Sequence, residues 1–84
     1  MFNKVIDKKR LEILANNLKR FREEQHITQK ELARYAGVAD LNIAQYEYCI
    51  VEPPATVLYN IAERLNVNLH RLFMDDYEWF EYNL

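Results

Sequence analysis

Serine is absent from this 84-residue chain, so no serine nucleophile is available. The single cysteine, Cys49, rules out an internal disulfide framework. The single glycine, Gly37, rules out a glycine-rich phosphate loop. No apolar run approaches the roughly 20 residues that span a bilayer, and residues 1–10 lack the apolar segment of a secretion signal. We therefore expect a cytoplasmic protein without a membrane segment.

Residues that could bind a metal ion or perform catalysis are scarce and scattered. Cys49, His26 and His70 lie far apart in the sequence and match no metal-ligand spacing. No paired-carboxylate motif stands out. We therefore expect no enzyme, no metal site, no cofactor and no small-molecule substrate.

The charge is divided unevenly along the chain, whose net charge is −2. Residues 1–74 carry 11 basic and 9 acidic side chains, whereas residues 75–84 carry 4 acidic side chains and no basic one. This division predicts a mildly basic domain over 1–74 followed by an acidic tail over 75–84. The weak overall charge argues against strong non-specific binding to nucleic acid, but it leaves room for a local basic face.

Apolar spacing, capping residues and breaks predict five helices. They cover residues 8–24, 28–36, 40–48, 55–65 and 69–73. Half of the residues are hydrophobic, which is enough for one modest core. Helices joined by short connections favour an all-α fold, a compact five-helix bundle.

Several helix ends can be predicted from individual residues. Asp7 is expected to cap the start of the first helix, and His26 to end it in the left-handed conformation that histidine tolerates better than most residues. Thr28 and Glu31 have the spacing of a capping box at the start of the second helix. Gly37 is expected to end that helix, which makes residues 28–48 two short helices joined by a tight turn.

With these positions in place, the chain resembles the Cro/repressor-type helix-turn-helix family, the XRE-like and lambdoid repressor-like group. The resemblance covers about residues 11–73. It rests on Thr28-Gln29, Leu32-Ala33, Gly37-Val38, Ile43, Glu47, Pro53, Leu58, Ile61-Ala62, Leu65, Val67 and Leu72. It implies a bundle of the lambda-repressor-like type with a short C-terminal extension.

The resemblance also implies roles for individual residues. The third helix would be the recognition helix in the major groove. Gln29 would contact a phosphate, and Tyr48 would lie near the DNA backbone. Asp40, Leu41 and Gln45 would face base edges.

The chemistry of the side chains supports part of this assignment. The amides of Asn42 and Gln45 can hydrogen-bond adenine, or they can be two polar groups on a solvated face. Lys19 and Lys30 can bind phosphates, or they can be ordinary surface charges. The resemblance further implies that Arg22 pairs with Glu47 as a structural buttress, and an arginine can bind a carboxylate through two hydrogen bonds.

Some positions depart from the family pattern. The family usually has serine at the positions of Ala39 and Ala44, and the loss at Ala39 removes a helix cap at a cost of about 1 kcal/mol. It usually has glycine at His26 and Cys49, and a left-handed Cys49 would cost roughly 1 kcal/mol relative to glycine. Asp40 suits the N-terminus of a helix but repels phosphate, so it would help only by accepting from a cytosine amino group.

The acidic tail contains a cluster of aromatic residues, namely Tyr77, Trp79, Phe80 and Tyr82. It could pack on its own bundle, form a dimer contact, or be a disordered acidic tag for another protein. The aromatic residues favour docking or dimerisation. We expect a homodimer on two DNA half-sites about 34 Å apart.

The leading hypothesis is a sequence-specific DNA-binding transcriptional regulator, a repressor that reads the major groove of double-stranded DNA with the helix over 40–48. The alternative is a protein-interaction module on the same fold, for example an antitoxin. It would use the face of that helix and the acidic, aromatic tail to bind a protein partner.

Overall fold

The computed structural model of the chain describes residues 5–84, and the side chains of residues 8–84. The part described contains six α-helices and no strand, which confirms the all-α class. The helices are α1 (Val5–Glu24), α2 (Gln29–Ala36), α3 (Asp40–Glu47), α4 (Ala55–Leu65), α5 (Leu69–Leu72) and α6 (Asp76–Tyr82). The prediction of five helices was therefore one short, because residues of the tail form α6.

The helices on either side of the predicted turn begin and end largely at the residues that the sequence predicts. The Thr28 hydroxyl accepts from the amide of Glu31 at 3.0 Å, and the Glu31 carboxylate accepts from the amide of Thr28 at 2.8 Å. Gly37 ends α2 with a φ of 77°, and His26 has a φ of 58°. The cap predicted at Asp7 was wrong, because α1 begins earlier, at Val5, where neither glycine nor proline breaks the helix.

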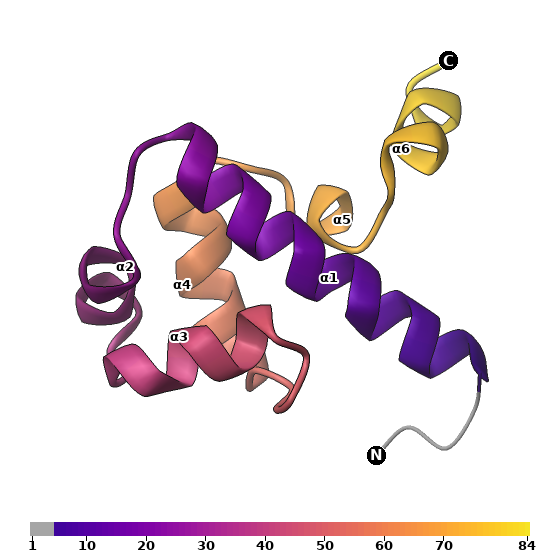
Figure 1. The fold of residues 1–84 in the computed structure, drawn as a ribbon. Coiled ribbons are helices and arrows are strands. Elements are labelled where there is room, and N and C mark those ends of the chain that lie inside the picture. Colours follow the sequence, from indigo (N-terminus) through magenta and orange to yellow (C-terminus); the bar gives the residue numbers. More distant parts are fainter. Residues whose placement is uncertain (1–4) are drawn as a thin grey trace.

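One core joins the helices and sets the position of α3. Figure 1 shows α1 running the length of the molecule, with α2, α3 and α4 gathered around its C-terminal half. Helix α2 packs on both α3 and α4, and α1 packs on α3. The largest fully buried side chains are Leu14, Leu18, Leu32, Ile43, Ile61, Leu65 and Leu72. They come from five helices, so α3 is fixed at the surface by packing from several sides.

A buried amide on α1 fixes the segment that follows α5. The Asn17 side chain donates to the carbonyl oxygens of Arg71, Leu72 and Met74 at 3.3, 2.9 and 2.8 Å. The last carbonyls of a helix have no partner within the helix, so they need such a donor. Asn17 therefore holds the end of α5 against α1.

Helix α6 is attached to the body mainly by charge. Asp76 accepts two hydrogen bonds from Arg20 at 2.9 and 2.8 Å and one from Arg71 at 2.6 Å. Glu78 accepts from Arg10 at 2.8 and 3.1 Å. No residue of α6 is buried, and the helix stands off beside α5 (Figure 1). The tail is thus a docked helix held by three arginines rather than a disordered segment.

Because these ion pairs lie at the surface and no residue of α6 is buried, α6 should detach at low pH before the core unfolds. Hydrogen bonds from Arg10 lower the pKa of Glu78 to about 2, and hydrogen bonds from Arg20 and Arg71 hold the pKa of Asp76 well below its usual range. Because these carboxyls have a lower pKa when α6 is docked, their ionisation stabilises docking fully at pH values above the ordinary carboxyl pKa near 4. This stabilisation is lost as the pH falls toward 2. High salt should weaken the same contacts.

Trp79 is the only tryptophan in the chain, and its ring lies 5.6 Å from the Arg71 guanidinium. Its fluorescence should therefore change between about pH 4 and pH 2 while helical circular dichroism is largely kept. Asp76→Asn should shift this change to higher pH. A tryptophan signal that changes only together with global unfolding would contradict the weak attachment of α6.

Candidate nucleic-acid interface

A buried ion pair ties α3 to α1. Arg22 Nε donates to Glu47 Oε2 at 2.6 Å, and Arg22 Nη2 donates to Glu47 Oε1 at 3.1 Å. The remaining guanidinium nitrogen, Nη1, donates to the carbonyl of Ile27 at 2.8 Å. The Glu47 side chain is only 2% exposed. Hydrogen bonding to Glu47 raises the pKa of Arg22, so the arginine stays charged inside the fold.

The same carboxylate also reaches α2. Gln29 Nε2 donates to Glu47 Oε1 at 3.0 Å. Gln29 is the first residue of α2, so Glu47 connects the start of α2, the end of α3 and the C-terminal part of α1. This three-way contact holds the two helices of the turn in one fixed arrangement.

The outer face of α3 combines one acid, one free amide and apolar groups. Leu41 is 66% exposed and Tyr48, which follows the helix, is 71% exposed. Asp40 is exposed, and Ala44 and Gln45 are partly buried. Positions three or four residues apart lie on the same side of a helix, so Leu41, Ala44, Gln45 and Tyr48 form one surface.

The predicted reading residue Asn42 has a structural task in this face. Its Oδ1 accepts from the backbone amide of Ala39 at 3.0 Å. Ala39 precedes α3 and has no side chain that could cap it. Asn42 thus supplies the one half of a capping box that does not need a polar side chain at position 39, and its carbonyl is engaged within the protein.

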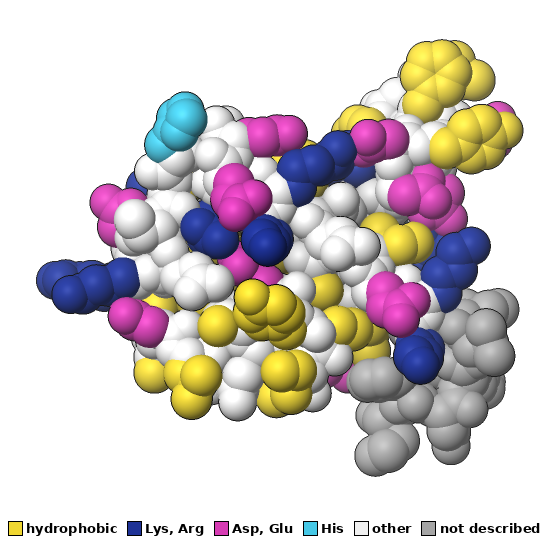
Figure 2. Space-filling view, in the orientation of Figure 1, with side chains coloured by type: hydrophobic (Ala, Val, Ile, Leu, Met, Phe, Trp, Pro, Cys, Tyr) yellow, Lys and Arg dark blue, Asp and Glu magenta, His cyan; other side chains and the backbone are white. Residues whose placement is uncertain are grey.

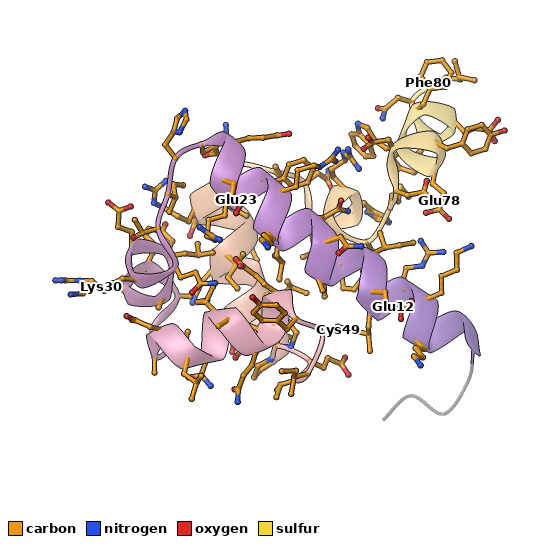
Figure 3. The ribbon with its side chains drawn as sticks, viewed as in Figure 1. Glu12, Glu23, Lys30, Cys49, Glu78 and Phe80 are labelled. Carbon is orange, nitrogen blue, oxygen red and sulfur yellow. The ribbon has the colours of Figure 1, made fainter. Side chains whose placement is uncertain are left out.

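Cationic side chains lie around α3 rather than on it. The ammonium of Lys19 stands 5.9 Å from the centre of the Tyr48 ring, beyond the end of α3. Lys30 is exposed on α2 and extends away from the body (Figure 3). Figure 2 shows hydrophobic side chains gathered along the side of the molecule where α3 lies. The face therefore has charge for phosphates only at its edges.

The family model HTH_3, described as helix-turn-helix, matches residues 18–72. This match spans the turn, the Arg22–Glu47 pair and helices α2 to α5. The chain belongs to this helix-turn-helix family. The family is that of Cro/repressor-like DNA-binding regulators, as the sequence pattern predicted, and its members are generally not enzymes.

Two solved structures share the fold of this helix-turn-helix protein. The hypothetical transcription factor NHTF from Neisseria is 22% identical, with a TM-score of 0.77, and the match covers 98% of this chain and 93% of that one. The clp gene regulator ClgR from Corynebacterium glutamicum is also 22% identical, with a TM-score of 0.71, over 75% of this chain and 67% of that one. No curated protein matches the sequence.

The loop after α3 adds exposed apolar residues to this helix-turn-helix domain that sequence reasoning missed. Ile50 and Val51 are exposed, and they extend the apolar surface beyond Tyr48. The signal was present in the sequence, since residues 49–51 contain no charged or amide side chain before Glu52. Cys49 has a φ of 59°, so it adopts the left-handed conformation at the position where the family usually has glycine.

The aromatic residues of the tail do not act as one group. Tyr77, Phe80 and Tyr82 are exposed, and Phe80 points away from the body of the molecule (Figure 3). Trp79 is partly buried between the Arg71 guanidinium and the ring of Tyr82, which is 5.5 Å away. These residues lie far from α3 (Figure 1), so the tail and the recognition face are separate surfaces.

In the part of the chain that the structure describes, no helix combines the length and the apolar character needed to cross a bilayer. Among the same residues, no group of three or more histidine, cysteine or acidic side chains is placed to hold a metal ion.

Proposed function

We propose that this protein is a sequence-specific transcriptional repressor that reads the major groove of double-stranded DNA with α3. The observation that carries the proposal is the contact of Glu47 with Arg22 and Gln29, which holds an exposed helix rigidly beside the N-terminus of α2. A reading helix has to keep its side chains in register with base edges, and a buried bidentate ion pair supplies that rigidity.

The residues of the interface divide into two kinds. The first kind contacts the DNA backbone, namely the phosphate-binding residues Lys19, Lys30 and Gln29 together with Tyr48. These contacts position the protein on the duplex but do not distinguish one base pair from another. Asp40, Leu41 and Gln45 face base edges. Asn42 is kept among the interface residues, with its main contribution the cap that it provides to α3.

A selection from a random pool of duplex DNA tests this function. The full chain should enrich a defined motif, and its affinity for that motif, measured by fluorescence anisotropy, should fall steeply as the salt concentration rises. Failure of the well-folded protein to enrich any motif would contradict the proposal.

We further propose that the protein binds as a homodimer through α6. The exposed rings of Tyr77 and Phe80 form an apolar surface on a helix that is distant from α3. Aromatic residues are enriched in interface cores, and a contact on this side leaves both recognition helices free. The selected DNA should then contain two half-sites about 34 Å apart.

Sedimentation over a range of protein concentrations tests the dimer. The wild type should associate, and Tyr77→Ser combined with Phe80→Ser should be monomeric. Tyr59→Ser is the matched control, because Tyr59 is similarly exposed but lies on α4. A wild type that stays monomeric at high concentration, with or without residues 75–84, would contradict the dimer.

A second candidate function is a protein-interaction module, as in an antitoxin. The specific observation in its favour is the exposed apolar surface formed by Leu41, Tyr48, Ile50 and Val51 on the recognition side. The acidic, aromatic tail would add to the contact with the partner. An antitoxin combines the two functions, since it binds a partner protein and its own operator. The DNA selection therefore separates a module that binds only protein, which enriches no motif, from one that also recognises DNA.

A further inference from the structure

The reading face of α3 contains no residue suited to guanine. Arginine and lysine are the side chains that most often recognise guanine, by donating to its O6 and N7. From Asp40 to Tyr48 the chain has neither. Of the cations near this helix, Arg22 is buried and bound to Glu47, and Lys19 stands over the Tyr48 ring beyond the helix end. A carboxylate only accepts hydrogen bonds, so Asp40 repels the two acceptors on the guanine edge.

The same face presents methyl groups to the solvent. Leu41 is largely exposed, and Ala44 lies three residues further on the same side of the helix. In the major groove, the C5 methyl of thymine is the one apolar group on a base edge. An apolar surface on a reading helix is therefore chemically matched to thymine.

Only one side-chain amide on this face is available for a base. The Asn42 carbonyl is taken by the amide of Ala39. Gln45 makes no side-chain hydrogen bond to any residue that the structure describes, and it lies beside Leu41 and Ala44. A glutamine amide pairs with the N6 and N7 of adenine through two hydrogen bonds.

We infer that α3 recognises a half-site rich in A·T pairs, with Leu41 and Ala44 packed against thymine methyl groups and Gln45 bound to adenine. Asp40 can only accept from a base amino group, that of adenine or of cytosine. This inference rests on the proposed DNA-binding function and specifies which bases that function reads. Recognition by methyl contacts adds affinity without adding charge, which suits a protein whose positive charge near α3 is sparse.

Removal of single methyl groups from the DNA tests the inference. In the selected duplex, each thymine of a half-site is replaced in turn by deoxyuridine, which lacks only the C5 methyl. For the wild type, at least one replacement should weaken binding about three- to fivefold, as expected when one methyl group is no longer buried. Anisotropy at one fixed salt concentration gives the dissociation constants.

Leu41→Ala shows whether α3 makes the contact. This variant should bind the thymine duplex more weakly, and the sensitive deoxyuridine replacement should have little further effect on it, because the pair of partners is already broken. Leu69→Ala is the matched control, an exposed leucine on α5 that should leave both constants unchanged. Circular dichroism verifies that each variant folds.

The outcomes distinguish a failure of the A·T inference from a failure of DNA binding itself. Specific binding that is insensitive to every deoxyuridine replacement, or a selected half-site dominated by guanine, overturns the inference and leaves the DNA-binding function intact. No enrichment of any duplex by the folded protein overturns both, and the apolar face of α3 is then a surface for a protein.

Discussion

Glu47→Ala should lower the free energy of unfolding by about 3–5 kcal/mol, the usual loss when one partner of a buried ion pair is removed. The substitution leaves the guanidinium of Arg22 buried with only the carbonyl of Ile27 as acceptor. It also removes the acceptor of Gln29, so the start of α2 loses its link to α3. A loss of this size is a large part of the total stability of a small domain.

Chemical denaturation of the purified protein measures this effect, and Glu23→Ala is the control. Glu23 also lies near Arg22, at 3.8 Å, but its side chain is 57% exposed. An exposed pair contributes at most about 1 kcal/mol, so the control should be close to the wild type. Equal effects of the two substitutions would show that the Arg22–Glu47 pair is not the buttress of the turn.

Gln45→Ala should cost about 1–3 kcal/mol of affinity for the selected duplex, which corresponds to roughly 5- to 150-fold. The side chain lies on the outer face of α3 and bonds to no described residue, so stability should change little. The variant should lose discrimination only at the base pair whose adenine Gln45 contacts, and it should keep its preference at the other positions. Anisotropy with the selected duplex and with its single-base variants measures both.

Lys30→Ala is the informative comparison for Gln45→Ala. Lys30 is exposed on α2 and extends outward (Figure 3), and in the proposed complex it contacts the phosphate backbone. Its loss should weaken binding to all duplexes alike and lower the salt slope by about 1. If Gln45→Ala behaves in the same uniform way, or has no effect, α3 is not the helix that reads the bases.

The local structure of the turn could be predicted because its signals are short in range. The capping box of Thr28 and Glu31 and the left-handed Gly37 act within four residues, and both stand where the sequence indicated. Helix α4 has the predicted bounds, Ala55–Leu65, because two prolines precede it and an apolar stripe defines its length. Helix α3 ended one residue before the prediction, at Glu47.

The task of Asn42 could not be read from spacing alone. An asparagine on a reading helix has the chemistry of an adenine contact, and the same amide can close the backbone of its own helix. The structure shows the second use, because the backbone amide of Ala39 lies within reach and donates to Asn42 Oδ1. Which of these two bonds the Asn42 amide makes depends on its side-chain rotamer, and the sequence pattern does not specify a rotamer.

The tail shows a similar limit. Its acids and aromatic residues were visible, but the partners of the acids include Arg10 and Arg20 on α1, which are far away in the sequence. No periodic pattern links residues at such separations. Arg71 of α5, the third partner, lies only five residues before Asp76. The start of α6 did have a local signal that sequence reasoning missed, because Asp75 and Glu78 form a capping box. The docking of α6, in contrast, depends on arginines of α1 that only the folded body brings beside it.

The sequence by itself determined the all-α class, the position of the turn, the left-handed His26 and Gly37, and the family, because these depend on local conformation and on the spacing of apolar residues. It did not indicate the left-handed Asn66 that ends α4. The Thr28–Glu31 capping box and, through the resemblance, the Arg22–Glu47 pair were also predicted, and both are present. Only the tertiary structure decided the other polar contacts between helices. Gln29 of α2 joins Arg22 of α1 at the Glu47 carboxylate of α3. The Asn17 amide binds the carbonyls at the end of α5, and α6 docks on the body through ion pairs. Contacts of this kind depend on the relative placement of distant helices, and that placement is set by packing of the whole core.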